Sequence, residues 1–116
     1  MAGATRDSVQ GGGYLHKWNL TNADGTGDKV SIVGAADRSV HIYGTFGSAT
    51  IVFQGTNDPD AGSGSWITLN DISGAAISAT EIYIAMVAEN TIFIRPVLTG
   101  GSGSTVSVRV LSRMGR

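Results

Sequence analysis

His16 and His41 are the only histidines in the sequence, so any acid–base catalysis near neutral pH would be expected to use one of them. A Ser-His-Asp set needs a histidine beside a nucleophile and an orienting carboxylate, and neither histidine lies in a nucleophile-elbow pattern. No other side chain has a spacing that would complete a metal site with the two histidines. We therefore predict that the protein is not an enzyme and uses no metal or cofactor.

The run Asn57-Asp58-Pro59-Asp60 offers closely spaced carboxylates, which are ligands that Ca²⁺ prefers. The alternate-position ligands and closing glutamate of an EF-hand loop are missing. A β-turn explains the same residues, because Asn and Asp side chains bond nearby backbone groups and proline fixes φ. We predict a long connection between strands here.

Trp66 follows that run, and an exposed tryptophan there could stack on a sugar ring. The neighbouring Ile67 and Leu69 favour the alternative, in which Trp66 anchors the core at the start of a strand.

The Gly100–Ser104 stretch lacks the lysine and following helix of a phosphate-binding loop, so we predict a hairpin turn. Arg95 and Arg109 would then lie on paired strands, either in an interface or in surface ion pairs.

Composition narrows the class of protein further. The 116 residues carry a formal net charge of −1, a charged share of only 15% and 17 glycines, and they include no cysteine. No basic stripe is present for nucleic acid, and no apolar run is long enough to span a bilayer. Few charges favour a surface that rests against other protein. We expect a soluble protein made in the cytoplasm.

Period-two alternation of apolar and polar residues predicts a series of short strands separated by glycine-rich turns. Val106, Val108 and Val110 share one face of the clearest strand. The Ile77–Glu89 segment mixes helix formers with β-rich residues, and we favour extended structure there. The predicted strands span 14–20, 29–33, 38–46, 49–54, 66–69, 91–98 and 105–111, with 38–46 and 49–54 forming one hairpin and 91–98 and 105–111 another.

These strands predict an all-β fold, an antiparallel β-sandwich of jelly-roll-like type. Residues 1–13 are polar, lack a period and end in three glycines, which predicts a flexible N-terminal arm. Residues 14–116 are expected to form the single domain.

Two stretches resemble a known group of proteins. Val52-Phe-Gln-Gly-Thr-Asn-Asp followed by Trp66-Ile-Thr-Leu-Asn-Asp is one, and the run from Phe93 to Val108 is the other. Together they resemble small all-β proteins of tailed bacteriophages, some of which are capsid decoration, or cement, proteins. The resemblance implies a virion protein on the capsid exterior that binds the major capsid protein and forms a homodimer or homotrimer. It implies neither a nucleic-acid nor a membrane partner.

Under this hypothesis the partner-binding residues would be aromatic anchors with charges at the rim. The anchors are Tyr14, Trp18 and Tyr43, and the rim charges are Arg6 and Arg113. In the alternative, Tyr14 and Trp18 close one end of the sandwich. The stretch around Trp66 also resembles discoidin-like carbohydrate-binding domains, although Pro59 stands where glycine is usual and the loop is longer. A carbohydrate-binding module is therefore the second hypothesis.

Overall fold

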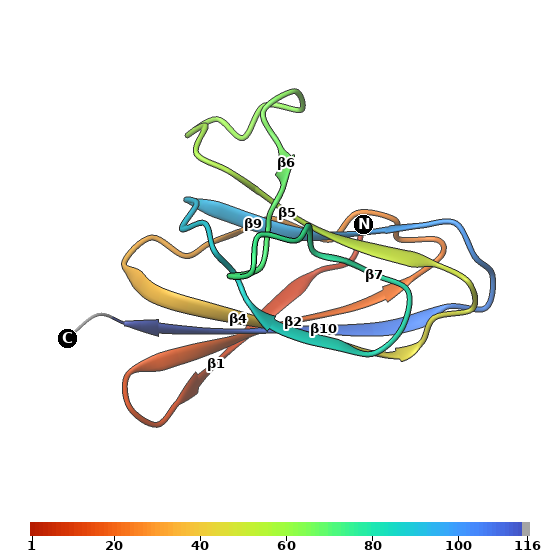
Figure 1. Ribbon diagram of the computed structural model, residues 1–116, viewed down its shortest axis with the longest axis horizontal. Coiled ribbons are helices and arrows are strands. Elements are labelled where there is room, and N and C mark those ends of the chain that lie inside the picture. Colours follow the sequence, from red (N-terminus) through yellow and green to blue (C-terminus); the bar gives the residue numbers. More distant parts are fainter. Residues whose placement is uncertain (115–116) are drawn as a thin grey trace.

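The computed structural model describes the backbone of residues 1–114, which forms ten strands and no helix (Figure 1). No helix among these residues is therefore long and apolar enough to cross a membrane. The strands are β1 (Ala4–Val9), β2 (Gly13–Thr21), β3 (Val30–Ser31), β4 (Ala35–Thr45), β5 (Thr50–Thr56), β6 (Ile67–Thr68), β7 (Ser78–Ala79), β8 (Tyr83–Met86), β9 (Phe93–Thr99) and β10 (Thr105–Met114).

The strands form two antiparallel sheets that lie against each other (Figure 1). The first sheet has the order β1-β2-β10-β4-β8, so the C-terminal strand lies between β2 and β4. The second sheet has the order β3-β9-β5-β6, and β7 also pairs with β5. The all-β prediction with antiparallel sheets is therefore confirmed.

The core lies between the sheets and follows the alternation in the sequence. From the first sheet, Trp18, Leu20, Val40, Ile42, Val106, Val108 and Val110 are fully buried, and from the second sheet Ile51, Phe53 and Ile94 are fully buried. Burying one such side chain contributes roughly 1.5–3 kcal/mol of hydrophobic free energy. The same alternation places the polar neighbours of these residues on the outside of each sheet.

The two predicted hairpins are wrong. β4 and β5 lie in different sheets, and so do β9 and β10. Each glycine-rich connection carries the chain from one sheet to the other, and Figure 1 shows both connections at the same end of the molecule. The two turns pack together there, since Ser102 N donates to Gly47 O at 2.9 Å and Ser104 Oγ donates to Phe46 O at 2.6 Å. Turn residues alone do not distinguish a hairpin from a crossing between packed sheets.

The separate N-terminal arm predicted for residues 1–13 is also wrong. Residues Ala4–Val9 form the edge strand β1, which pairs with β2 from Ala4↔Trp18 to Val9↔Gly13. Gly11 and Gly12, both with positive φ, make the tight turn of this hairpin. The glycines that suggested a flexible arm allow the chain to reverse. The strand itself is polar because it lies at the edge of the sheet.

The Ile77–Glu89 segment is extended, as predicted, and contributes β7 and β8. β8 pairs with β4 from Ser39↔Met86 to Ile42↔Tyr83 and so forms the far edge of the first sheet. The chain just before β7 returns to this edge, because Ile72 N donates to Met86 O at 3.2 Å and Ala88 N donates to Asn70 O at 2.8 Å.

Candidate functional site

The outer face of the first sheet is a broad surface whose side chains are aligned by the strand register. One row across all five strands contains Thr5, Lys17, Arg109, His41 and Ile84. The next row contains Asp7, Leu15, Leu111, Ser39 and Met86. Each row therefore changes from charged or polar residues at the β1 edge to aliphatic residues at the β8 edge.

The charged part of this face is held by direct contacts. Lys17 Nζ lies 2.6 Å from Asp7 Oδ2, in an ion pair on the surface. Arg109 donates from Nη1 to Trp18 O at 2.8 Å and from Nη2 to Asn19 Oδ1 at 3.1 Å. A surface ion pair of this kind contributes at most about 1 kcal/mol. These contacts order the side chains and give the face a defined shape.

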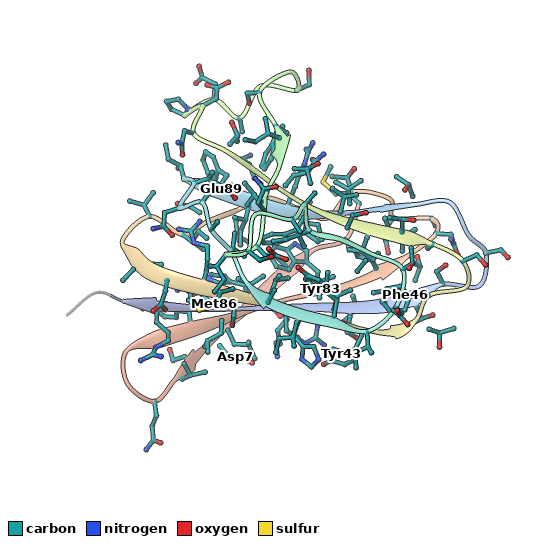
Figure 2. The ribbon with its side chains drawn as sticks, in the orientation of Figure 1. Asp7, Tyr43, Phe46, Tyr83, Met86 and Glu89 are labelled. Carbon is teal, nitrogen blue, oxygen red and sulfur yellow. The ribbon has the colours of Figure 1, made fainter. Side chains whose placement is uncertain are left out.

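Tyr43 lies on the same face, and Figure 2 shows it on the side of the first sheet that points away from the second sheet. Its ring centre is 4.7 Å from that of His41, and the Arg109 guanidinium lies 5.8 Å from the Tyr43 ring centre. Tyr43 is half-buried and remains available on one side. Such a supported aromatic ring fits the anchor role predicted for it.

Exposed aliphatic side chains gather at the β8 edge. We define the aliphatic edge patch as Ile72, Ile82, Ile84 and Met86, which are 69%, 69%, 67% and 42% exposed, respectively. The Ile72–Met86 backbone bond joins the two segments that carry the patch. Several large aliphatic side chains exposed together are unusual on a monomer surface, which makes this patch a candidate contact surface.

The Asp71 carboxylate fixes the loop that carries Ile72, one residue of the patch. It accepts hydrogen bonds from Ser73 N and Oγ, from Ala75 N, and from the Tyr83 hydroxyl at 3.1 Å. The bonds from Ser73, followed by that from Ala75, lower the pKa of Asp71 below its usual value. The loop that carries Ile72 is therefore fixed to β8 by a carboxylate that is ionised at neutral pH.

A second candidate surface lies on the outside of the second sheet, around Trp66. A groove of about 290 Å³ is lined by Met1, Gly27, Asp28, Lys29, Ala61, Trp66 and Arg95. The Arg95 guanidinium lies 4.0 Å from the Trp66 ring centre, and Arg95 Nε donates to Gln54 Oε1 at 2.9 Å. The groove therefore combines an aromatic face with charged side chains of both signs.

The prediction that Trp66 anchors the core is wrong. Trp66 is half-buried on the outer side of the second sheet, and Ile67 beside it is 58% exposed. β6 has only two residues, so the alternation of its side chains between the two faces is too short to place Trp66 in the core. The tryptophan in the core is Trp18, which is fully buried and donates from Nε1 to Asp28 O at 2.8 Å.

The Asn57–Asp60 stretch forms a turn, as predicted. Asp58 Oδ1 accepts from Asp60 N at 3.0 Å, and Oδ2 accepts from Gly62 N at 2.9 Å. The bonds from Gly62 and then Asp60 lower the pKa of the Asp58 carboxyl. Within the described part of the chain, no group of three or more His, Asp or Glu side chains gathers as a metal site would require.

The predicted partner-binding residues do not form one cluster. Trp18 is excluded as a surface anchor by its burial in the core. Arg6 and Tyr14 contact each other, with the guanidinium 4.4 Å from the ring centre, at one end of the inner face of the first sheet. Arg113 is exposed on the outer face beside Leu111, and Tyr43 lies farther along that face.

Arg95 and Arg109 are not on paired strands. β9, with Arg95, belongs to the second sheet, and β10, with Arg109, belongs to the first. Their side chains lie on opposite outer faces of the molecule, and neither residue forms an ion pair with a described residue.

The aliphatic edge patch was missed from the sequence. Its signal was the run Ile82-Tyr-Ile-Ala-Met-Val-Ala88, which contains no charged residue. A charge-free run fits a buried element as well as an exposed edge, so only the register with β4 shows which side chains face outward.

Comparisons of the chain with protein-family models, with curated proteins and with solved structures found no match. Fold and surface therefore define the class on their own. The protein is a small all-β protein of two packed antiparallel sheets, with an exposed aliphatic patch at the edge of one sheet.

Proposed function

We propose that the protein is a non-enzymatic structural protein of a bacteriophage virion, which binds the major capsid protein on the exterior of the shell and stabilises it. The observation that carries the proposal is the aliphatic edge patch on a chain with few charges. Covering these side chains removes apolar area from water at about 25 cal/mol per Å². We further infer that the two sheets form a jelly-roll-like sandwich, the fold expected for such decoration proteins.

The patch suits attachment to a protein better than catalysis. It presents aliphatic side chains on a fixed edge and no titratable group that could act as an acid or base. A shell offers many identical binding positions, so a modest contact repeated over the shell adds substantially to its cohesion. Tyr43 and Arg113, on the same outer face, would extend the contact toward the centre of the sheet.

We also propose that the protein self-associates as a homodimer or homotrimer. β8 is an edge strand without charged residues, and natural edge strands commonly carry charges that prevent pairing with another chain. A second copy or a capsid strand placed there would extend the sheet through main-chain hydrogen bonds. Equilibrium ultracentrifugation of the purified protein would detect the oligomer, and a monomer at all concentrations would contradict this part of the proposal.

Co-sedimentation with purified tailed-phage shells, assembled from the major capsid protein of the phage that carries this chain, tests the function. We expect the wild-type protein to sediment with the shells at a fixed stoichiometry. Ile84→Lys should weaken this binding at least tenfold, because a charge would have to be buried in the contact. Ile67→Lys is the matched control, since Ile67 is 58% exposed on the other sheet and should leave binding unchanged.

Two results would contradict the proposal. The wild-type protein could remain in the supernatant with intact shells, or the two lysine variants could lose binding equally. The second result would mean that the binding surface is not the β8 edge.

The Trp66 groove supports a second candidate function, a carbohydrate-binding module. An aromatic ring flanked by Asp28, Lys29 and Arg95 has the apolar face and the hydrogen-bonding groups that a sugar subsite needs. A glycan array distinguishes the candidates. Binding of a glycan that is abolished by Trp66→Ala but not by Ile84→Lys would favour the carbohydrate module over the capsid protein.

A further inference from the structure

The inner face of the first sheet changes from apolar to polar at one end. Beyond the core, the inward positions are occupied by His16, Ser112 and Arg38, which are 4%, 2% and 2% exposed. Ser112 lies opposite Arg38 on one side and opposite Tyr14 on the other, and Arg6 lies opposite His16. Strand register therefore places Arg6 beside His16 and Arg38 beside Ser112, at inward positions where alternation alone would place aliphatic residues.

Arg6 and Arg38 have no carboxylate partner among the described residues. The ion pairs there are Met1–Asp24 and Lys17–Asp7, and neither involves Arg6 or Arg38. Arg38 donates from Nη1 to Thr91 O at 3.0 Å, whereas its buried Nε has no partner. A buried guanidinium without an anion costs considerable desolvation free energy. The charge balance at this end is thus incomplete in the isolated chain.

The pKa of His16 is affected by this excess of positive charge. Its Nε2 lies 3.2 Å from Ser112 Oγ, so the ring is held in the cluster. Burial lowers the pKa of His16, and the positive charges of Arg6 and Arg38 lower it further.

Two cavities open onto the cluster. The smaller, about 80 Å³, is lined by Arg6, Tyr14, His16, Ser112 and the chain from Ser31 to Ala35. The larger, about 190 Å³, is lined by Arg38, Asn90, Thr91, Ile92 and the chain from Ile32 to Ala35. Ile32, Val33 and Ala35 line both, so aliphatic walls stand beside the cationic groups. The smaller cavity has room for a compact anionic group on a short aliphatic stem.

We propose that this end of the molecule binds a carboxylate carried on an aliphatic chain. The planar carboxylate matches the guanidinium group of Arg6 in the smaller cavity, and the stem lies against Ile32 and Val33. Arg38 lines the neighbouring cavity and adds positive charge at this end. The source of the carboxylate rests on the proposed function, and it is an acidic side chain of the capsid protein. Val33 is 70% exposed, so a partner can reach the site from outside.

A titration with propionate, at constant ionic strength set by chloride, tests the site directly. Nitrogen-15 NMR resolves the arginine Nε–H signals, and we expect a saturable shift of the Arg6 signal. The Arg109 signal should not move, because that side chain lies on the outer face. Bound propionate should also raise the pKa of His16, since an anion stabilises the imidazolium. Shifts that are linear in concentration and equal with chloride would overturn the proposal.

Variants separate this site from the proposed function. Arg6→Gln should weaken propionate binding at least tenfold, whereas Arg109→Gln should leave it unchanged. Arg6 is exposed, so the first variant retains the fold, and thermal unfolding verifies this. If shells bind wild type and Arg6→Gln equally, the carboxylate site plays no part and is rejected while the capsid function stands. If propionate binds but shells do not, the site stands and the capsid function is rejected.

Discussion

The guanidinium group of Arg95 lies 4.0 Å from the centre of the Trp66 ring, on the outer side of the second sheet. Gln54 orients this arginine through Nε, so the ring is covered by a fixed cation. A contact of this type contributes about 0.5–1 kcal/mol at an exposed position. The two tryptophans of the chain therefore have different roles, one on the surface and one in the core.

Replacing each tryptophan by phenylalanine tests this difference. Trp18→Phe should lower the free energy of unfolding by about 2 kcal/mol or more, because it leaves a cavity and removes the bond to Asp28 O. Trp66→Phe should cost less than about 1 kcal/mol, as surface substitutions usually do. Urea unfolding followed by circular dichroism measures both, and a larger loss for Trp66 would contradict the assignment.

The sequence was informative about strands and core faces, and less so about pairing. Alternation in Val106–Val110 identified inward residues that the structure buries. It could not show which strands are neighbours, since β10 pairs with β2 across more than eighty residues and with β4 rather than β9. Such long-range pairing depends on how the two sheets close the core. The glycine-rich turns are compatible with either arrangement.

The candidate surfaces were harder to predict for the same reason. Tyr43 lies on the outer face of β4, in line with the regular alternation of its neighbours in the sequence. The aliphatic edge patch arises from two segments, around Ile72 and around Ile84, that only tertiary hydrogen bonds bring together. The positions of Arg6, His16 and Arg38 on the inner face likewise depend on strand register.

The packed turns at the crossing end give a second prediction. Gly47 and Gly103 have similar positive φ values, 56° and 63°. A Cβ at Gly47 would collide with the Ser102 carbonyl oxygen, whereas nothing lies within 4 Å of one at Gly103. Gly103→Ala should therefore cost about 1 kcal/mol of unfolding free energy for the backbone conformation alone. Gly47→Ala should cost clearly more, by thermal or urea unfolding, and equal losses would show that the two turns do not pack together.

The pH dependence of stability gives a third prediction. The pKa of His16 is lowered in the folded state, so the folded protein binds fewer protons than the unfolded chain. Its contribution is therefore complete above the unfolded pKa of about 6.5 and is lost as pH falls below that value toward the folded pKa. Wild type should lose stability between pH 7 and pH 5, and His16→Gln should lose less.

The aspartates with lowered pKa values do not confuse this measurement. The pKa values of Asp24, Asp58 and Asp71 are shifted downward from 3.8. The stability that these ionised carboxylates contribute is therefore lost only below that pH. Urea unfolding at several pH values between 5 and 7 measures the slope. The same slope in wild type and His16→Gln would show that His16 does not titrate as the structure implies.

Hydrogen exchange of the protein, free and bound to shells, tests the central claim most directly. Mass spectrometry would identify the peptides whose backbone amide hydrogens exchange more slowly on binding. The account predicts strong protection of residues 70–73 and 82–87, which carry the aliphatic edge patch, and little change around Trp66. Protection confined to the Trp66 groove, or no protection in the presence of shells, would contradict the claim that the β8 edge is the surface by which this protein binds its partner.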